Sequence, residues 1–131
     1  MDKTVAIVGT FDTKGEEFQY VKERFEEIGI NTLTIHCGVF DPAYAPDISN
    51  EEVTRAVDIE LSTIVEKRDR ALATETMTEG IKRLLPALYN NGRFQGVFSM
   101  GGSGGTSIAT AGMQALPIGV PKIMVSTMAS G

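Results

Sequence analysis

Residues 94–116 read FQGVFSMGGSGGTSIATAGMQAL, and this stretch decides the fold. The short apolar run 94–100 predicts a strand, and the small-residue segment 106–116 predicts a helix. Four glycines lie between the two, at positions 101, 102, 104 and 105. The stretch therefore predicts a strand that leads through a glycine-rich loop into a helix.

The glycine-rich loop favours an anion-binding site. Glycine weakens helices and strands because it loses the most backbone freedom on folding, and a bare turn needs only one or two. The first-turn amides of a helix and its dipole attract phosphate, and the hydroxyls of Ser103, Thr106 and Ser107 would add donors. We expect phosphate oxygens to approach Gly104, where a side chain would block them or conflict with a positive φ. A tight turn without a ligand stays open as the alternative.

The rest of the chain alternates in the same way between strands and helices. The expected strands are 4–9, 31–38, 94–100 and 121–127. The expected helices are 15–29, 50–67 behind a Ser49–Glu52 capping box, 70–90 with Pro86 kinking it or starting a new piece, and 106–116. This alternation predicts an α/β, Rossmann-like open parallel sheet with helices on both faces. We expect the strand order 2-1-3-4, which brings loops 9–15 and 99–107 into one crevice at the carboxyl ends of the strands.

Length, charge and cysteine content narrow the class of protein. The chain has 131 residues, which predicts one domain, and a net charge of −5, which argues against nucleic-acid and anionic-membrane surfaces. No apolar run approaches the ~20 residues of a membrane span. The single cysteine, Cys37, cannot form an internal disulfide, so we expect a cytoplasmic setting. The chain ends where a further helix would begin, and we expect it to be the N-terminal part of a longer protein with an incomplete sheet.

Two known phosphate motifs fit the sequence poorly. A P-loop requires lysine after its last glycine, where this chain has Thr106. The first strand–helix turn, GTFDTKG (9–15), lacks the spacing of the dinucleotide fingerprint. The glycine loop also resembles the GGDGT loop of phosphofructokinase-like kinases, but Ser103 replaces the acidic residue of that motif.

Several polar residues allow both a binding and a structural interpretation. Asp12 would bind Mg²⁺, ribose hydroxyls or a base edge, or else cap the first helix. Lys14 would pair with a phosphate or stay in solvent. Arg70 would reach a phosphate if its segment folds over the strand ends, a solvated charge being the default. His36 and Cys37 are too few for a zinc site, and we expect no metal site there.

Larger motifs resemble the N-terminal domain of the tomato mosaic virus resistance protein family, whose bacterial members are largely uncharacterised. The motifs are VGTFDTKGEE (8–17), HCGVFDP (36–42), RDRALATETMTEGIKRLL (68–85), SMGGSGGTSIAT (99–110) and VSTMASG (125–131). The resemblance implies a Rossmann-like domain that binds ATP, with or without Mg²⁺, followed in full-length members by a TIM-barrel-like domain. Carried over by motif, the nucleotide contacts fall on Gly9, Thr10, Asp12, Thr13, Lys14, Gly101, Gly102, Ser103, Gly104, Gly105, Thr106, Ser126, Thr127, Ser130 and Gly131.

The sequence thus predicts nucleotide binding and leaves catalysis open, because no complete acid–base pair or nucleophile triad is visible. One alternative is a protein-interaction domain whose glycine loop is purely structural. Another is a small-molecule kinase or hydrolase whose other catalytic residues lie beyond residue 131. Small residues in 106–116 would allow close packing against the sheet or against a second copy in a homo-oligomer.

Overall fold

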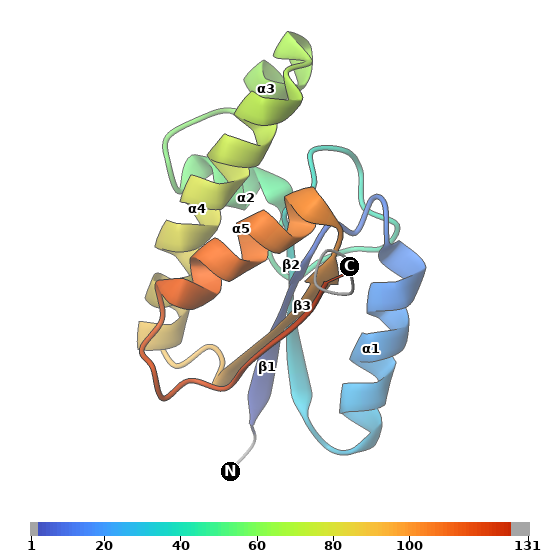
Figure 1. Ribbon diagram of the computed structural model, residues 1–131. Helices are drawn as coiled ribbons and strands as arrows, with labels where there is room; N and C mark the ends of the chain where they lie inside the picture. The colour runs from blue at the N-terminus through green and yellow to red at the C-terminus, as the bar shows by residue number, and fades with distance from the viewer. Residues whose placement is uncertain (1–2, 127–131) are drawn as a thin grey trace.

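The computed structural model describes residues 3–126 and contains a parallel sheet. Its strands are β1 (Thr4–Gly9), β2 (Asn31–His36), β3 (Gly96–Gly101) and β4 (Lys122–Ser126). They lie in the order β2-β1-β3-β4 (Figure 1), which confirms the order expected from the sequence. The strands form because β-branched and aromatic residues fit a sheet that is covered on both faces.

Helices cover both faces of the sheet, as expected (Figure 1). They are α1 (Gly15–Glu27), α2 (Asn50–Arg55), α3 (Leu61–Lys67), α4 (Arg70–Asn90) and α5 (Ser103–Gln114). On one face, α1 buries Phe18 against Ile7 and Phe11. On the other, α4 and α5 bury a larger apolar core that includes Val8, Ile81 and Ile108. The sheet is therefore the middle layer of three, with its carboxyl edge left to the loops.

The segment 50–67 differs from its expected single helix. Ser49 caps α2 as predicted, since its hydroxyl accepts a hydrogen bond of 3.3 Å from the Glu52 amide. The helix then ends at Arg55, because Asp58 adopts a left-handed conformation (φ 59°) and Ile59 donates back to the Thr54 carbonyl. This left-handed ending is a common helix terminus, but glycine usually marks it. An aspartate gave no such signal in the sequence.

Two other helices also depart from expectation. The helix α4 runs unbroken from Arg70 to Asn90, so the alternative that a new piece starts at Pro86 was wrong. The helix α5 begins at Ser103, three residues before the expected start, and takes Gly104 and Gly105 into its first turn. The glycine loop is therefore shorter, and the helix longer, than the sequence suggested.

The small residues of α5 allow close packing against α4. A Cβ atom at Gly112 would lie 2.4 Å from Cγ2 of Ile81 and 2.7 Å from Cδ1 of Leu85. The neighbour that Gly112 accommodates is thus a helix, whereas we expected the sheet or a second subunit. This contact fixes α5, and with it the glycine-rich turn, relative to α4.

Candidate functional site

The candidate site lies at the carboxyl ends of β1 and β3, where the chain leaves the two neighbouring parallel strands. The two strands pair directly, from Val5 beside Gly96 to Val8 beside Ser99. The chain after β1 returns to β2 on one side, whereas β3 and β4 lie on the other. The loops at the carboxyl ends of β1 and β3 therefore diverge and leave a crevice, the usual ligand site in open α/β sheets.

A cleft of about 410 Å³ occupies this crevice. Five residues that the sequence nominated for nucleotide binding line it, namely Thr10, Asp12, Thr13, Gly104 and Gly105. Its other walls come from the loop after β2 and from α4 and α5, with the residues Cys37, Gly38, Val39, Phe40, Arg70, Ala73, Thr74, Met77 and Ile108. The fold thus brings the two nominated loops together across one cavity, which we name the crevice cleft.

Not every nominated residue lines the crevice cleft. Gly9, Lys14, Gly101, Gly102, Thr106 and Ser126 are described by the structure but lie outside its lining. The side chain of Ser103 and the residues Thr127, Ser130 and Gly131 fall outside the described part of the chain. The lining therefore narrows the described candidates to the β1–α1 loop and the first turn of α5.

The first turn of α5 lines the cleft and begins with backbone amides that lie before the first internal hydrogen bond of the helix. The helix closes its first internal hydrogen bond from the Thr106 amide to the Gly102 carbonyl, at 2.9 Å. The amides of Gly104 and Gly105 precede this bond, so the helix itself offers them no acceptor. The positive end of the helix dipole lies at the same place. The arrangement is suited to an anion.

The space around Gly104 and Gly105 is open. A Cβ atom added at either position would meet nothing within 4 Å. Neither glycine has a positive φ, so the expectation of a left-handed backbone at Gly104 was wrong. Within residues 3–126, packing and backbone conformation therefore do not require glycine at these positions.

Side-chain hydrogen bonds hold the turn between β3 and α5 in place. The Thr106 hydroxyl lies 2.7 Å from the Ser126 hydroxyl at the end of β4, and it donates to the Gly101 carbonyl at 3.3 Å. These bonds join the ends of two strands to the first turn of α5. Thr106 and Ser126 thereby position the amides of Gly104 and Gly105.

The β1–α1 loop folds back on itself beside the cleft. The amides of Thr13 and Lys14 both donate to the Thr10 carbonyl, at 3.2 and 3.0 Å, and the hydroxyls of Thr10 and Thr13 lie 2.8 Å apart. Lys14 occupies the N-cap position of α1 without a capping side-chain hydrogen bond. The loop is therefore fixed by local bonds, and its residues Thr10 and Thr13 line the cleft.

Asp12 does not cap α1, which was one of its two expected roles. Its Oδ2 accepts a hydrogen bond of 3.2 Å from the amide of Phe40, across the cleft wall. Its Oδ1 is buried and has no hydrogen-bond partner. A Cβ at Gly38 would lie 2.2 Å from that same Oδ1, so only glycine at 38 leaves room for the carboxylate. A buried carboxylate oxygen without a donor is costly, and a ligand donor would remove that cost.

His36 and Cys37 serve the fold. The imidazole Nδ1 accepts from the Phe11 amide at 3.2 Å, and Nε2 donates to the Phe40 carbonyl at 2.8 Å. Burial, with a smaller contribution from the charge of Asp12, raises the pKa of Cys37 to about 12. A thiol with this pKa stays protonated at neutral pH and is a poor nucleophile. Among the described residues, no group of three or more His, Cys, Asp or Glu could hold a metal ion.

Arg70 and Thr74 line the cleft, although the sequence favoured neither as a site residue. Asp69 caps α4 by accepting a bond of 3.1 Å from the Leu72 amide, so Arg70 is the first residue of a well-started helix. A charge run in the sequence does not show which helix end will fold over the strand ends. Only the long-range packing of α4 beside α5 reveals it.

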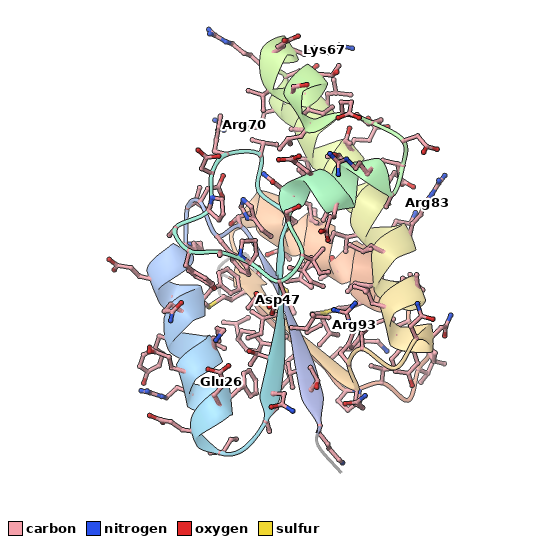
Figure 2. The ribbon with its side chains drawn as sticks, turned by 180° about the vertical axis from the view of Figure 1, so that it is seen from behind. Glu26, Asp47, Lys67, Arg70, Arg83 and Arg93 are labelled. Carbon is pink, nitrogen blue, oxygen red and sulfur yellow. The ribbon has the colours of Figure 1, made fainter. Side chains whose placement is uncertain are left out.

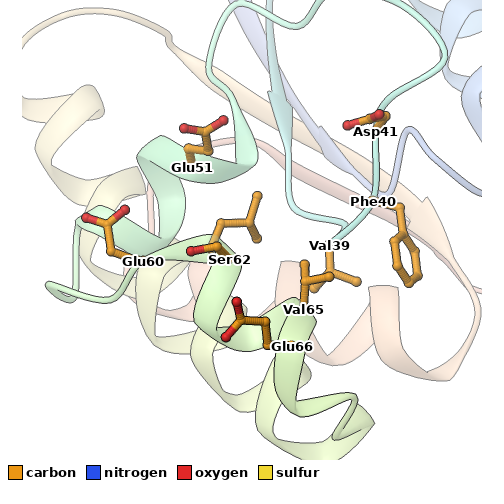
Figure 3. Close-up of a pocket in the computed structure, with 9 residues that line it drawn as sticks. Val39, Phe40, Asp41, Glu51, Glu60, Ser62, Val65 and Glu66 are labelled. Carbon is orange, nitrogen blue, oxygen red and sulfur yellow. The ribbon is translucent and has the colours of Figure 1, made fainter.

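A larger hollow lies elsewhere on the described surface and has the wrong charge for an anion. It measures about 740 Å³ and lies between the loop after β2 and the helices α2 and α3. Figure 3 shows the carboxylates of Asp41, Glu51, Glu60 and Glu66 around its apolar floor. Four carboxylates would repel a phosphate. We therefore place the candidate site in the smaller crevice cleft.

Comparison with known proteins then identifies the family. The model of the Uncharacterised protein family (UPF0261) N-terminal domain matches residues 3–131. The chain belongs to this family. The UPF0261 relatives include a protein of Clostridium tetani, 42% identical over 132 residues, and one of Rhizobium meliloti, 43% identical over 129 residues.

Coverage shows how much of each relative this UPF0261 domain represents. The alignments cover 100% and 98% of this chain but only 33% and 32% of the two bacterial relatives. The ToMV resistance protein Tm-1 of Solanum lycopersicum is 27% identical over 97% of the chain and 19% of that protein. The chain thus spans about a third of the length of the bacterial relatives. No helix within residues 3–126 is long and apolar enough to cross a membrane.

Proposed function

We propose that this domain binds a nucleotide, most specifically ATP, in the crevice cleft. One observation carries the proposal: Gly104 and Gly105 begin α5, have open space where side chains would project, and line the cleft. Glycine is about 1 kcal/mol less favourable than alanine within a helix. A ligand that approaches the backbone closely would account for two glycines that the protein's own packing does not need.

The phosphates would lie on the first turn of α5. The amides of Gly104 and Gly105 would donate to phosphate oxygens, and the helix dipole would favour the negative charge. Each charge-assisted hydrogen bond contributes about 1.5–3 kcal/mol. The volume of about 410 Å³ falls in the range of small-molecule sites.

Asp12 would bind a hydrogen-bond donor of the nucleotide or a metal ion bound to it. Its carboxylate, on the cleft lining, suits a ribose hydroxyl, or a Mg²⁺ ion shared with the phosphates. Magnesium is commonly held by one or two carboxylates together with substrate phosphates, so a single aspartate fits that role. The hydroxyls of Thr10 and Thr13 lie on the same wall and would add polar contacts.

The proposal concerns binding within a longer protein. The bacterial relatives are about three times as long as this chain, and we infer that a further domain, TIM-barrel-like by the family resemblance, completes the protein. Catalysis stays open, since Cys37 keeps its proton and Asp12 is the one carboxylate among the described lining residues.

Calorimetric titration of ATP, with and without Mg²⁺, tests this proposal. Saturable binding to the wild-type chain, reduced at least tenfold in Gly104→Val, is the expected result. A folded wild-type chain that takes up no heat with ATP would contradict it, and the protein-interaction alternative would then be favoured.

A further inference from the structure

Arg70 is a cationic residue of the crevice cleft that has no ion-pair partner within residues 3–126. Among the described lining residues, Arg70 and Asp12 carry the charges, and Arg70 alone is positive. Its side chain is exposed and has no hydrogen-bond or ion-pair partner within residues 3–126. Lys14, the cation that the sequence favoured for a phosphate, is not part of the lining.

The backbone of Arg70 is held in place. It is the first residue of α4, whose start is capped by Asp69, and α4 packs along α5 through Gly112. The guanidinium therefore starts from a rigid position on the cleft wall formed by α4. The amides of Gly104 and Gly105 lie on the wall formed by α5.

We propose that Arg70 binds a second phosphate group of the nucleotide and makes the site selective for polyphosphates over monophosphates. This inference rests on the proposed function. The first turn of α5 can hold one phosphate by its own amides and dipole, without Arg70. A phosphate chain that extends from there meets one cationic side chain on the lining, and a guanidinium matches phosphate oxygens in bidentate geometry.

The chain offers a matched control for this inference. Arg83 lies on the same helix, is also exposed, and is not part of the cleft lining. Figure 2 shows Arg70 and Arg83 projecting to opposite sides of the molecule. Arg70→Gln and Arg83→Gln thus make the same change of charge on one helix, and only the first alters the cleft.

The experiment is calorimetric titration of wild type, R70Q, R70K and R83Q with ATP, ADP, AMP and inorganic tripolyphosphate at one ionic strength. We expect R70Q to weaken ATP, ADP and tripolyphosphate by about 10- to 100-fold, as for loss of a charge-assisted hydrogen bond, and AMP by less than about threefold. R70K keeps the positive charge but lacks the bidentate guanidinium geometry, so its loss of affinity should be intermediate. R83Q should bind all four ligands like wild type, and thermal melts should show all variants folded.

Two results would overturn the inference about Arg70 alone, and a third would also overturn the proposed function. Equal losses for AMP and ATP in R70Q would show that Arg70 does not select polyphosphates. Wild-type affinity for ATP in R70Q would show that Arg70 does not bind phosphate, while leaving the proposed function intact. Absence of binding by the folded wild-type chain would remove both the proposed function and this inference.

Discussion

Two sets of glycines in this domain behave in opposite ways. A Cβ at Gly80 would lie 2.3 Å from the Val53 carbonyl oxygen, and one at Gly112 would lie 2.4 Å from Ile81 Cγ2. A Cβ at Gly104 or Gly105 would meet nothing within 4 Å. The first set is glycine because helices press against it. The second set has no such packing neighbour among residues 3–126, and this difference directs attention to a ligand.

The same contrast separates other residues around the cleft. Cys37 is buried, and both ring nitrogens of His36 form hydrogen bonds with backbone groups. Both residues therefore serve the fold. Within residues 3–126, Asp12 keeps a buried oxygen without a partner, and the exposed guanidinium of Arg70 has none either. The predictions below test this division, beginning with the largest expected effect.

Cys37 should react very slowly with thiol reagents in the native state. With its pKa raised by burial from an ordinary value of 9.0 to about 12, its thiolate fraction at pH 8 should be about a thousandfold lower than in the unfolded chain. Labelling by a disulfide reagent, with and without urea, measures this ratio. Because the native pKa is raised, the native state keeps its proton longer, and stability should fall as the pH rises from 9 towards 12. Rapid native labelling at pH 8 would place Cys37 with the site residues instead.

Gly80→Ala should cost about 2–3 kcal/mol of unfolding free energy, because the new methyl group would press on a backbone carbonyl of α2. Urea denaturation followed by circular dichroism measures the loss. A variant as stable as wild type would show that the contact between α2 and α4 is loose, and would weaken the contrast between the two sets of glycines.

Asp12→Asn should raise the unfolding free energy by about 1 kcal/mol, since a neutral amide costs less to bury than a carboxylate with one of its two oxygens unpartnered. It should also weaken ATP binding, because the carboxylate charge next to the ligand is lost. Denaturation and titration of the same preparation give both numbers. A loss of stability comparable with that of Gly80→Ala would assign Asp12 to the fold.

Sequence patterns were sufficient for the sheet and for placing the β1–α1 loop and the first turn of α5 beside one cleft. Short apolar runs separated by helical segments gave the strands and their order, because a parallel sheet tolerates few alternative connections. Local patterns failed where the decisive contact was distant or the residue atypical. The break at Asp58 lacks the usual glycine, and the partner of Gly112 is another helix. Arg70 lies on the cleft only because α4 packs beside α5. The residues next to Arg70 in the sequence do not predict that packing.

The most direct test of the central claim compares Gly104→Ala and Gly104→Val with wild type, measuring stability and ATP affinity on the same samples. The alanine variant should be more stable by about 0.4–1 kcal/mol, because the site is helical, open and free of positive φ. Both variants should bind ATP more weakly, and the valine variant should lose at least tenfold because its side chain occupies the space of the phosphate oxygens. Valine at 104 with wild-type ATP affinity in a folded chain would contradict the account and leave the glycine turn without a ligand.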